Sequence, residues 1–343
     1  MDLTVSLAWT AAVAAAVFAA SLIGTGMIIR LLRKRAIFDH PNERSSHSTP
    51  TPKGAGLAII PVIAAVWIGI GWEGPESRIT LIVIAAALGL AVLSWIDDLR
   101  GLSPLVRLFG QTAAVTFVLA SAPSGALYFG GLLPAFADPL AAGLLWLWFI
   151  NLFNFMDGID GIAGVETAGI GIGIALVAST AGLGGTFFIY GLVLAAAALG
   201  FLWWNWHPAK VFLGDVGSVP LGFLLGWLLL GLAQSGLWAA ALILPFYYLM
   251  DATITLVRRA LRGEIIWQAH REHFYQRAVR RGLSHSQVVI HVLCADGILV
   301  LLAVYAAAGW VWASLIGAVI VVSWLLYYLG TGRKFPSSPE GGL

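Results

Sequence analysis

The sequence is poor in charge and nearly free of cysteine. Only 10% of its 343 residues are charged, against about 25% in a soluble domain, while 59% are hydrophobic and the mean hydropathy is +0.89. So little polar surface excludes a soluble fold, a disordered chain and a nucleic-acid-binding domain. The single cysteine, Cys294, excludes an intrachain disulfide. We therefore expect a polytopic integral membrane protein.

Long apolar runs make up most of the chain and predict an all-α fold, because a membrane span needs about 20 apolar residues in a helix. The first run is followed, not preceded, by basic residues, so it is not expected to be a cleaved signal peptide. About eleven transmembrane helices are expected, and they cover 7–29, 56–72, 79–96, 105–121, 139–156, 162–181, 186–204, 218–233, 236–257, 287–308 and 310–329.

The placement of Lys and Arg predicts the orientation, because cytoplasmic loops carry an excess of both. All but one of the 19 basic residues fall on one side, and Arg78 is the exception. We expect the N-terminus outside, the C-terminus in the cytoplasm, and one transmembrane domain over 1–343 with a flexible tail at 331–343. Five cytoplasmic loops are expected to form the site, at about 30–55, 97–104, 151–161, 205–218 and 258–286.

Five carboxylates stand at or just inside the ends of these spans: Asp97, Asp98, Asp157, Asp160 and Asp215. An ionisable group at membrane depth is costly and indicates function. Acids that converge on one face repel one another unless a cation joins them, and oxygen ligands favour Mg²⁺, with Mn²⁺ as the alternative. Since Mg²⁺ completes its shell with phosphates and water, a phosphorylated substrate is expected. The competing interpretation is that Asp97 and Asp98 only cap a helix and mark the interface.

Glycines flank two of these acids. Gly158 and Gly161 surround Asp160, and Gly214 and Gly217 surround Asp215. Each segment leads into a helix, whose N-terminus favours anions, so a phosphate cradle is one interpretation. The evidence is weak alone, because the chain has 40 glycines and most suit helix packing.

The last cytoplasmic loop is the longest and most basic. His270 and His273 are spaced to share a helical face with Arg277, which predicts donors for a diphosphate. As a zinc site the pair lacks a third ligand, and a solvated basic loop is the alternative. His285 and His291 have no assigned role, and Asp251 and Asp296 are expected to pair across helices with partners that the sequence does not name.

Five motifs in order, one per cytoplasmic loop, resemble the polyprenyl-phosphate N-acetylhexosamine-1-phosphate transferases. That family includes the phospho-MurNAc-pentapeptide translocase and the transferases that start O-antigen and teichoic acid linkage units. The resemblance covers roughly residues 39–285. The motifs are Pro-Thr-Pro-Lys-Gly-x-Gly, Asp-Asp, Asn-x-x-Asn-x-x-Asp-Gly-x-Asp-Gly, Pro-Ala-Lys-Val-Phe-Leu-Gly-Asp-x-Gly-Ser and His-x-x-His.

The resemblance implies a role for each matching residue. Asp215, with Asp98, resembles the family's Mg²⁺ ligand, and Asp97 or Asp98 resembles the acid proposed to act on the lipid phosphate. The other implied catalytic residues are Asp157, Asp160, His270 and His273. Asp157, Asp160 and Asn154 also resemble the residues that form the polar floor of the nucleotide-sugar site. The other implied substrate-binding residues are Thr51, Lys53, Asn205, Phe212, Arg271 and Arg277, with Phe212 stacked on the uracil.

The implied reaction joins undecaprenyl phosphate and a UDP-N-acetylhexosamine to give undecaprenyl-diphosphate–sugar and UMP at the bacterial inner membrane. Leu-Arg-Gly after Asp98 and His-Arg-Glu-His in the last loop depart from the pentapeptide branch. They favour the branch that initiates O-antigen and other surface polysaccharides with a 6-deoxy or GlcNAc-type hexosamine. The sequence is compatible with a homodimer.

Two other classes of protein compete with this interpretation. A transporter or flippase of a phosphorylated lipid or anion could use the same loops, but it would carry charged groups near the midplane and gates on both sides. A scaffold of a polysaccharide-synthesis complex would explain the spans but not the five acidic motifs.

Overall fold

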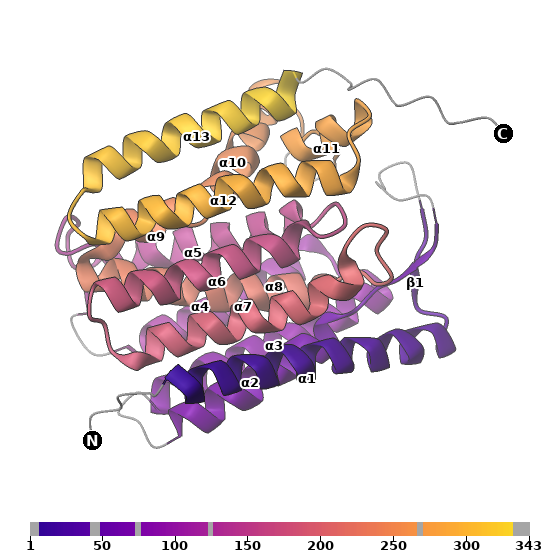
Figure 1. The fold of residues 1–343 in the computed structure, drawn as a ribbon, viewed down its shortest axis with the longest axis horizontal. Coiled ribbons are helices and arrows are strands. Elements are labelled where there is room, and N and C mark those ends of the chain that lie inside the picture. The colour runs from indigo at the N-terminus through magenta and orange to yellow at the C-terminus, as the bar shows by residue number, and fades with distance from the viewer. Residues whose placement is uncertain (1–6, 42–48, 73–76, 123–125, 266–269, 332–343) are drawn as a thin grey trace.

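The structure is a computed structural model that describes residues 7–41, 49–72, 77–122, 126–265 and 270–331. These residues are almost entirely helical, and the helices lie side by side along one direction (Figure 1). The expected tail lies outside the described residues beyond Thr331, as does Arg44 of the first loop.

Eight helical segments of the described chain are long and apolar enough to cross a membrane, which makes this a multi-pass membrane protein. Seven are single helices: α1 (Leu7–Lys34), α3 (Ser77–Arg100), α5 (Ala137–Met156), α6 (Ile162–Thr180), α7 (Gly185–Asn205), α12 (His285–Ala307) and α13 (Val311–Thr331). The eighth joins α8 (Asp215–Leu232), the π-helical turn η1 (Ala233–Leu237) and α9 (Trp238–Ile243).

Shorter elements complete the fold. The helices α2 (Gly56–Gly71) and α4 (Pro104–Ala120) are apolar but shorter than the eight, and α10 (Phe246–Leu261) and α11 (Phe274–Arg280) lie before α12. Strands β1 (Phe38–Asp39) and β2 (Thr51–Pro52) pair antiparallel, with Phe38 opposite Pro52 and Asp39 opposite Thr51.

The ninth expected span, 236–257, is not one helix. The first residues of this span, up to Ile243, continue α8 through η1. The sequence predicted a break between 233 and 236, but the structure has only a bend there, at Gly236, whose φ is 84°. The helix α9 ends at Ile243, with Leu244 as its C-cap. Pro245 has no N–H to continue the helical hydrogen bonds, so a separate helix, α10, begins at Phe246. The sequence carried this signal in Pro245.

Close backbone contacts hold the helices together, as expected where lipid supplies no hydrophobic drive between helices. At the crossing of α6 and α7, a Cβ added to Gly171 would lie 2.6 Å from the carbonyl oxygen of Gly191, and the reverse holds for Gly191. The hydroxyl of Ser21 in α1 donates to the carbonyl oxygen of Ala197 in α7 at 2.6 Å. Small residues therefore set the distances within the bundle.

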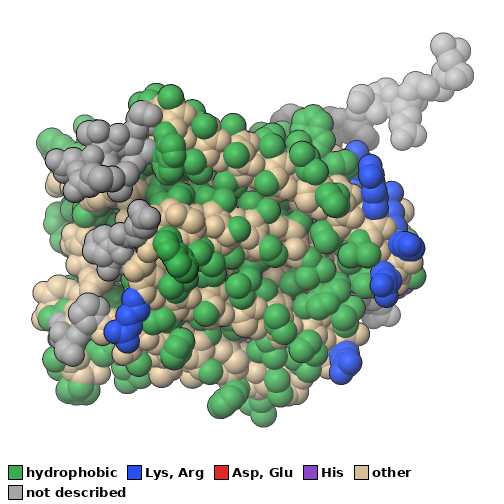
Figure 2. Space-filling model, turned by 90° about the horizontal axis from the view of Figure 1, so that it is seen from below, with side chains coloured by type: hydrophobic (Ala, Val, Ile, Leu, Met, Phe, Trp, Pro, Cys, Tyr) green, Lys and Arg blue, Asp and Glu red, His purple; other side chains and the backbone are tan. Residues whose placement is uncertain are grey.

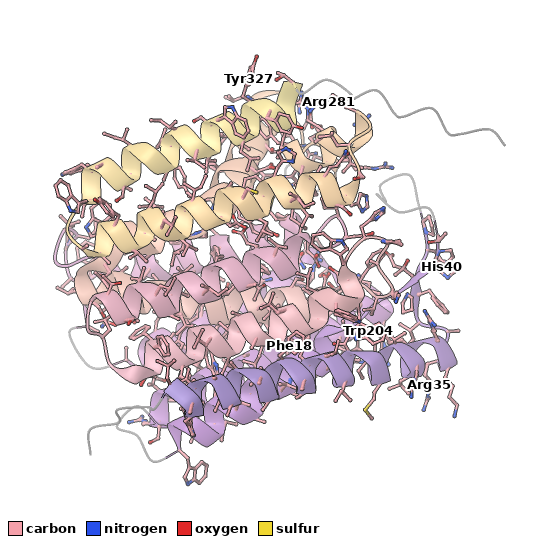
Figure 3. The ribbon with its side chains drawn as sticks, viewed as in Figure 1. Phe18, Arg35, His40, Trp204, Arg281 and Tyr327 are labelled. Atoms are coloured by element: carbon pink, nitrogen blue, oxygen red, sulfur yellow. The ribbon has the colours of Figure 1, made fainter. Side chains whose placement is uncertain are left out.

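Polar groups gather at one end of the bundle. We call the end that carries β1, β2 and α11 the loop end; α1 begins at the opposite end, and α13 ends at the loop end (Figure 1). The lateral face seen in Figure 2 is largely apolar, and its Lys and Arg side chains gather mainly at the loop end. Arg35, His40 and Arg281 all lie there (Figure 3). An apolar wall with a basic end suits a protein surrounded by lipid.

The glycine contact between α6 and α7 makes a prediction. Gly171→Ala places a methyl group against backbone atoms, so it should destabilise the protein by about 1–3 kcal/mol. Gly69→Ala in α2 is the matched control, because nothing lies within 4 Å of its added Cβ. Thermal unfolding of both variants in detergent checks this. Equal melting temperatures for the two variants would contradict the packing described here.

Candidate functional site

The first and fourth loops pair with each other through their backbones. Lys53 and Phe212 form a parallel bridge, in which the N–H of Phe212 donates to the carbonyl oxygen of Pro52 at 2.8 Å. The N–H groups of Gly54 and Ala55 both donate to the carbonyl oxygen of Phe212 at 3.0 Å. Two motifs about 160 residues apart in the chain thus form one short ribbon at the loop end.

The glycines of these two motifs allow that contact. Gly54 and Gly214 have φ of 128° and 75°, values that side chains rarely adopt. A Cβ on Gly56 would lie 2.3 Å from the Cα of Gly217. The expected phosphate cradle is therefore, in the first place, a close contact of one glycine-rich segment with the other.

Asp98 occupies the N-terminus of α8. Its carboxylate accepts the N–H groups of Asp215 at 3.2 Å and Val216 at 3.0 Å, and its side chain is 2% exposed. An anion at this position satisfies unpaired donors and matches the helix dipole. The N-terminus of α8, where the sequence predicted a phosphate, is thus occupied by the carboxylate of Asp98.

Lys53 joins this carboxylate to the next. Its Nζ lies 2.7 Å from Oδ1 of Asp98 and 3.8 Å from Oδ1 of Asp215. Burial lowers the pKa of Lys53, but the charges of Asp215 and Asp98 outweigh it and hold the pKa above its ordinary value. Lys53 therefore stays positively charged at any physiological pH.

Arg107, in the first turns of α4, bridges the second pair of acids. Its guanidinium lies 3.2 Å from Oδ2 of Asp97 and 3.6 Å from Oδ2 of Asp215. Asp97 also accepts the N–H of Leu102 at 2.5 Å. From the sequence, Arg107 was only one of the basic residues on the cytoplasmic side, and no role in the site was predicted for it. The carboxylate cluster is our name for Lys53, Asp97, Asp98, Arg107 and Asp215.

A cavity of about 150 Å³ opens beside the carboxylate cluster, between α3, α4, α5 and α8. Its polar lining includes Asp97, Arg107 and Asp215, together with Asn154 of the third loop motif. The remaining lining is mostly apolar, and includes Leu90 and Leu93 of α3. The Asn154 amide donates to Ser218 Oγ at 2.8 Å, which fixes its direction. The wall of the cavity thus combines charged, polar and apolar side chains.

Asp157 ends α5 and faces the same charges. Burial, and after it the charge of Asp215, raises the pKa of Asp157 to about 7, while Lys53 acts in the opposite direction. Its neighbour Gly158 packs against α11, where an added Cβ would lie 2.2 Å from the hydroxyl oxygen of Tyr275. A cation near Asp157 would relieve this repulsion.

Asp160 has partners of its own. Its Oδ2 lies 2.6 Å from Nδ1 of His207 and 3.3 Å from Nδ1 of His285, and it accepts the N–H of Ala209 at 3.1 Å. Burial raises the pKa of Asp160, but the hydrogen bonds from His285 and His207 lower it further, so the group is ionised. Neither histidine was expected in the site; the one signal for His207 was its place in the fourth loop, directly before the fourth motif.

Asn205 ties the third loop to the fourth. Its side-chain oxygen accepts the N–H of Gly161 at 2.8 Å, and its amide donates to the carbonyl oxygen of Val211 at 2.9 Å. The Asn205 side chain is buried, so it would serve a nucleotide site by holding these two loops in position. Phe212 beside it is half-buried, and Thr51 is buried and donates to the carbonyl oxygen of Thr49.

In the fifth loop, Asp251 of α10 organises α11. Its Oδ1 lies 3.1 Å from Nδ1 of His273 and accepts the N–H of Phe274 at 3.0 Å, and its Oδ2 accepts the hydroxyl of Tyr247. The sequence placed Asp251 in a pair without naming the partner, which is His273. The other unassigned acid, Asp296, lies next to Glu166 of α6.

The remaining residues of that loop differ in exposure. His273 is buried, whereas His270 and Arg271 are half-buried, and Arg277 is exposed with its guanidinium over the ring of Phe274. Burial, then the charges of His273 and Arg259, lowers the pKa of His270 to about 4. At neutral pH, His270 can thus donate or accept a hydrogen bond but carries no charge.

Comparison with known proteins now identifies the family. The model of glycosyl transferase family 4 matches residues 80–233. A probable undecaprenyl-phosphate N-acetylglucosaminyl 1-phosphate transferase of Bacillus subtilis is 31% identical over 86% of this chain and 84% of its own length. The chain belongs to glycosyl transferase family 4. It is therefore an enzyme, a transferase, as the five motifs predicted.

Other members of family 4 support this at similar identity. A decaprenyl-phosphate N-acetylglucosaminephosphotransferase of Mycobacterium tuberculosis is 30% identical over 80% of this chain and 76% of its own length. A phospho-N-acetylmuramoyl-pentapeptide-transferase of Kosmotoga olearia is 30% identical over 62% of this chain and 69% of its own length. The family model, over residues 80–233, runs from α3 to α8 and includes the loops that carry Asp97, Asp98, Asp157, Asp160 and Asp215.

His270 predicts a response to acid. Its pKa in the folded protein, about 4, lies below the ordinary 6.5, so the unfolded chain binds this proton first. The stability linked to neutral His270 is complete above about pH 6.5 and is lost as the pH falls toward 4. His270→Gln should therefore lose less melting temperature than the wild type between about pH 7 and about pH 5. An equal loss in both proteins would contradict the assignment.

Proposed function

We propose that this enzyme transfers an N-acetylhexosamine-1-phosphate from a UDP-sugar to undecaprenyl phosphate, releasing UMP and giving undecaprenyl-diphosphate–sugar. One observation carries the proposal: Lys53, Arg107 and Asp215 converge at the ends of membrane helices, beside a cavity lined by both charged and apolar side chains. One substrate is soluble and the other keeps its tail in lipid, so such an interface suits both. The names of the relatives support the same chemistry.

The lipid phosphate needs a cation and a fixed direction. Arg107 lines the cavity with its guanidinium 38% exposed, and its planar donors suit a phosphate. A phosphate oxygen attacks the β-phosphorus of the UDP-sugar, and the bond from that phosphorus to the oxygen of UMP breaks. A phosphate monoester has a second pKa of about 6 and is mostly dianionic at neutral pH, so it hardly needs a general base. Asp97 is held by Arg107 and Leu102 and acts by positioning Arg107.

The carboxylate cluster fits Mg²⁺, with Mn²⁺ as the alternative. The nearest cationic nitrogens lie 3.6 and 3.8 Å from Asp215, beyond normal hydrogen-bond distance, and its side chain is 23% exposed. Asp215 has a hydrogen bond with the Asn154 side chain but no close cation, whereas Asp98 accepts two N–H groups of α8 and contacts the ammonium of Lys53. Hard oxygen donors suit Mg²⁺, and a cation would favour the ionised form of Asp157, whose pKa is raised first by burial and then by the charge of Asp215. We assign Asp215 as the ligand, with Asp98 in support; bound there, Mg²⁺ would offset charge on the diphosphate.

The third, fourth and fifth loops would bind the nucleotide sugar. Asn154 lines the cavity beside the carboxylate cluster, and Asp157 lies close enough to feel the charges of Asp215 and Lys53. Phe212 offers a ring for the uracil. Arg271 and Arg277 would attract the diphosphate, while His270 and His273 would donate hydrogen bonds to it. Asp251 positions His273 for that role.

The cellular setting belongs to the same proposal. We propose a single domain of eleven membrane segments, the ninth of which is divided into α9 and α10 at Pro245. The N-terminus would lie outside and the five loops on the cytoplasmic face of the bacterial inner membrane. An N-acetylglucosamine-type sugar is favoured by the names of the relatives, and a 6-deoxy hexosamine stays in the panel of donors. The product would start a cell-surface polysaccharide such as an O-antigen, and a homodimer is compatible with this role.

The experiment is UMP release by the purified enzyme with undecaprenyl phosphate, a panel of UDP-N-acetylhexosamines, and either Mg²⁺ or EDTA. We expect release to require both the lipid and the metal. Asp215→Asn should lower the rate by about a hundredfold or more. Glu264→Gln is the matched control, because Glu264 pairs with Arg259 and Arg262, away from the cavity, and should keep the wild-type rate.

Three results would contradict the proposal. UMP release that persists with EDTA would contradict the metal requirement, and a wild-type rate in Asp215→Asn would contradict the assignment of Asp215 as the ligand. No release with any donor, from folded protein that still binds the lipid phosphate, would favour a transporter of phosphorylated lipids.

A further inference from the structure

Two histidines and a carboxylate meet at the loop end, apart from the carboxylate cluster. Asp160 precedes α6, His207 follows α7, and His285 begins α12, so three separate segments contribute. One oxygen or nitrogen atom of each side chain lies within 4.8 Å of the other two. We call this set the histidine cluster. The described residues contain no other group of three His, Cys, Asp or Glu side chains with this spacing.

The nitrogen of His285 has contradictory partners. Its Nδ1 receives the backbone N–H of Asp160 at 3.3 Å, which requires an unprotonated nitrogen. The same Nδ1 faces Oδ2 of Asp160 at 3.3 Å, where an unprotonated nitrogen would set one lone pair against another. A positive charge between nitrogen and oxygen removes this conflict, and it can be a proton or a metal ion.

The surroundings favour a metal ion of intermediate softness. The ring centroids of His207 and His285 are 4.8 Å apart, and the Nδ1 atoms of both rings face the same oxygen, Oδ2 of Asp160. Asp160 and His285 are 7% exposed, whereas His207 is 39% exposed and gives solvent access. The N–H of Ala209 also binds Oδ2 of Asp160 and fixes it, as outer partners of metal ligands do.

We propose that Asp160, His207 and His285 form a second cation site, selective for Zn²⁺ or a similar transition-metal ion. Two imidazoles and one carboxylate are ligands that zinc accepts, with water in the remaining position. Mg²⁺ prefers oxygen ligands alone, so the carboxylate cluster and the histidine cluster bind different ions. This assignment does not depend on the sugar, the lipid or the reaction proposed above.

Such an ion has a structural consequence for the active site. It joins the loop that carries Asp157 and Asp160 to the fourth loop and to the start of α12. Asn205 makes a parallel connection through Gly161 and Val211. The ion would therefore stiffen the floor of the nucleotide-sugar site without contacting the reacting phosphates.

The test uses Co²⁺, which reports four-coordinate nitrogen and oxygen sites by strong visible absorption. Tag-free enzyme is stripped with chelator and titrated with Co²⁺ in excess Mg²⁺, which occupies oxygen-only sites. We expect a single equivalent to bind with a visible band, and Zn²⁺ to displace it. His207→Gln and His285→Gln should each weaken Co²⁺ binding roughly tenfold or more.

Two controls make the result specific. His291→Gln removes a histidine of α12 that stacks on Tyr328, outside the cluster, and should bind Co²⁺ like the wild type. Asp215→Asn should also keep the band, which separates this site from the proposed Mg²⁺ site. His207 is partly exposed, so His207→Gln should fold, and its melting temperature should no longer rise with Zn²⁺ as that of the wild type does.

The proposal is overturned if the wild type shows no visible band, or if the band persists in both His207→Gln and His285→Gln. In that case a proton holds the histidine cluster together. Loss of the band in Asp215→Asn alone would assign the ion to the carboxylate cluster and would equally overturn the proposal. Since the readout is absorption, failure of the transferase assay does not alter the result.

Discussion

The contact of Asp98 with the first turn of α8 and with Lys53 is the constraint on which the loop end depends. A carboxylate that is 2% exposed would be costly if unpaired, and here two backbone N–H groups and one ammonium surround it. This contact joins the end of α3, the start of α8 and the first loop. The glycines at 54 and 214 permit the approach, so the position of Asp215 follows from it.

Charge balance then decides what the site can bind. The carboxylate cluster holds three acids and two cations, and Asp157 adds an acid whose pKa is raised to about 7. The acids are thus under-compensated, which favours a cation, and the cation would in turn favour a phosphate. The partly exposed guanidinium of Arg107 offers a further positive charge to a phosphate. An enzyme that brings two anionic substrates together at an interface needs this balance.

Much of this could be predicted from the sequence. Charge depletion and apolar runs predicted the membrane fold, and the five motifs predicted the family, which the relatives confirm. Ten of the eleven expected spans coincide with a helix. The exception, 236–257, was wrong because its total hydropathy concealed Pro245.

The partners of individual residues could not be predicted, because they depend on the register of distant segments. Asp98 was expected beside a metal ion, but its contact with the first turn of α8 was not foreseen, because that contact is set by how α3 ends beside α8. The approach of His207 to His285 joins residues 78 positions apart, and Asp251 meets His273 only because α11 folds back on α10. Motif order reveals which loops form a site; it does not reveal which side chains neutralise which.

The most direct test of this account is a double-mutant cycle between Lys53 and Asp98, with thermal unfolding measured in EDTA. Lys53→Met leaves the buried carboxylate of Asp98 without its ammonium, and Asp98→Asn leaves Lys53 with Asp215 alone, so each should destabilise the protein. The double variant removes both charges together and should be more stable than the sum predicts, with a coupling of about 0.5–3 kcal/mol. Additive losses would contradict the claim that this ion pair organises the loop end.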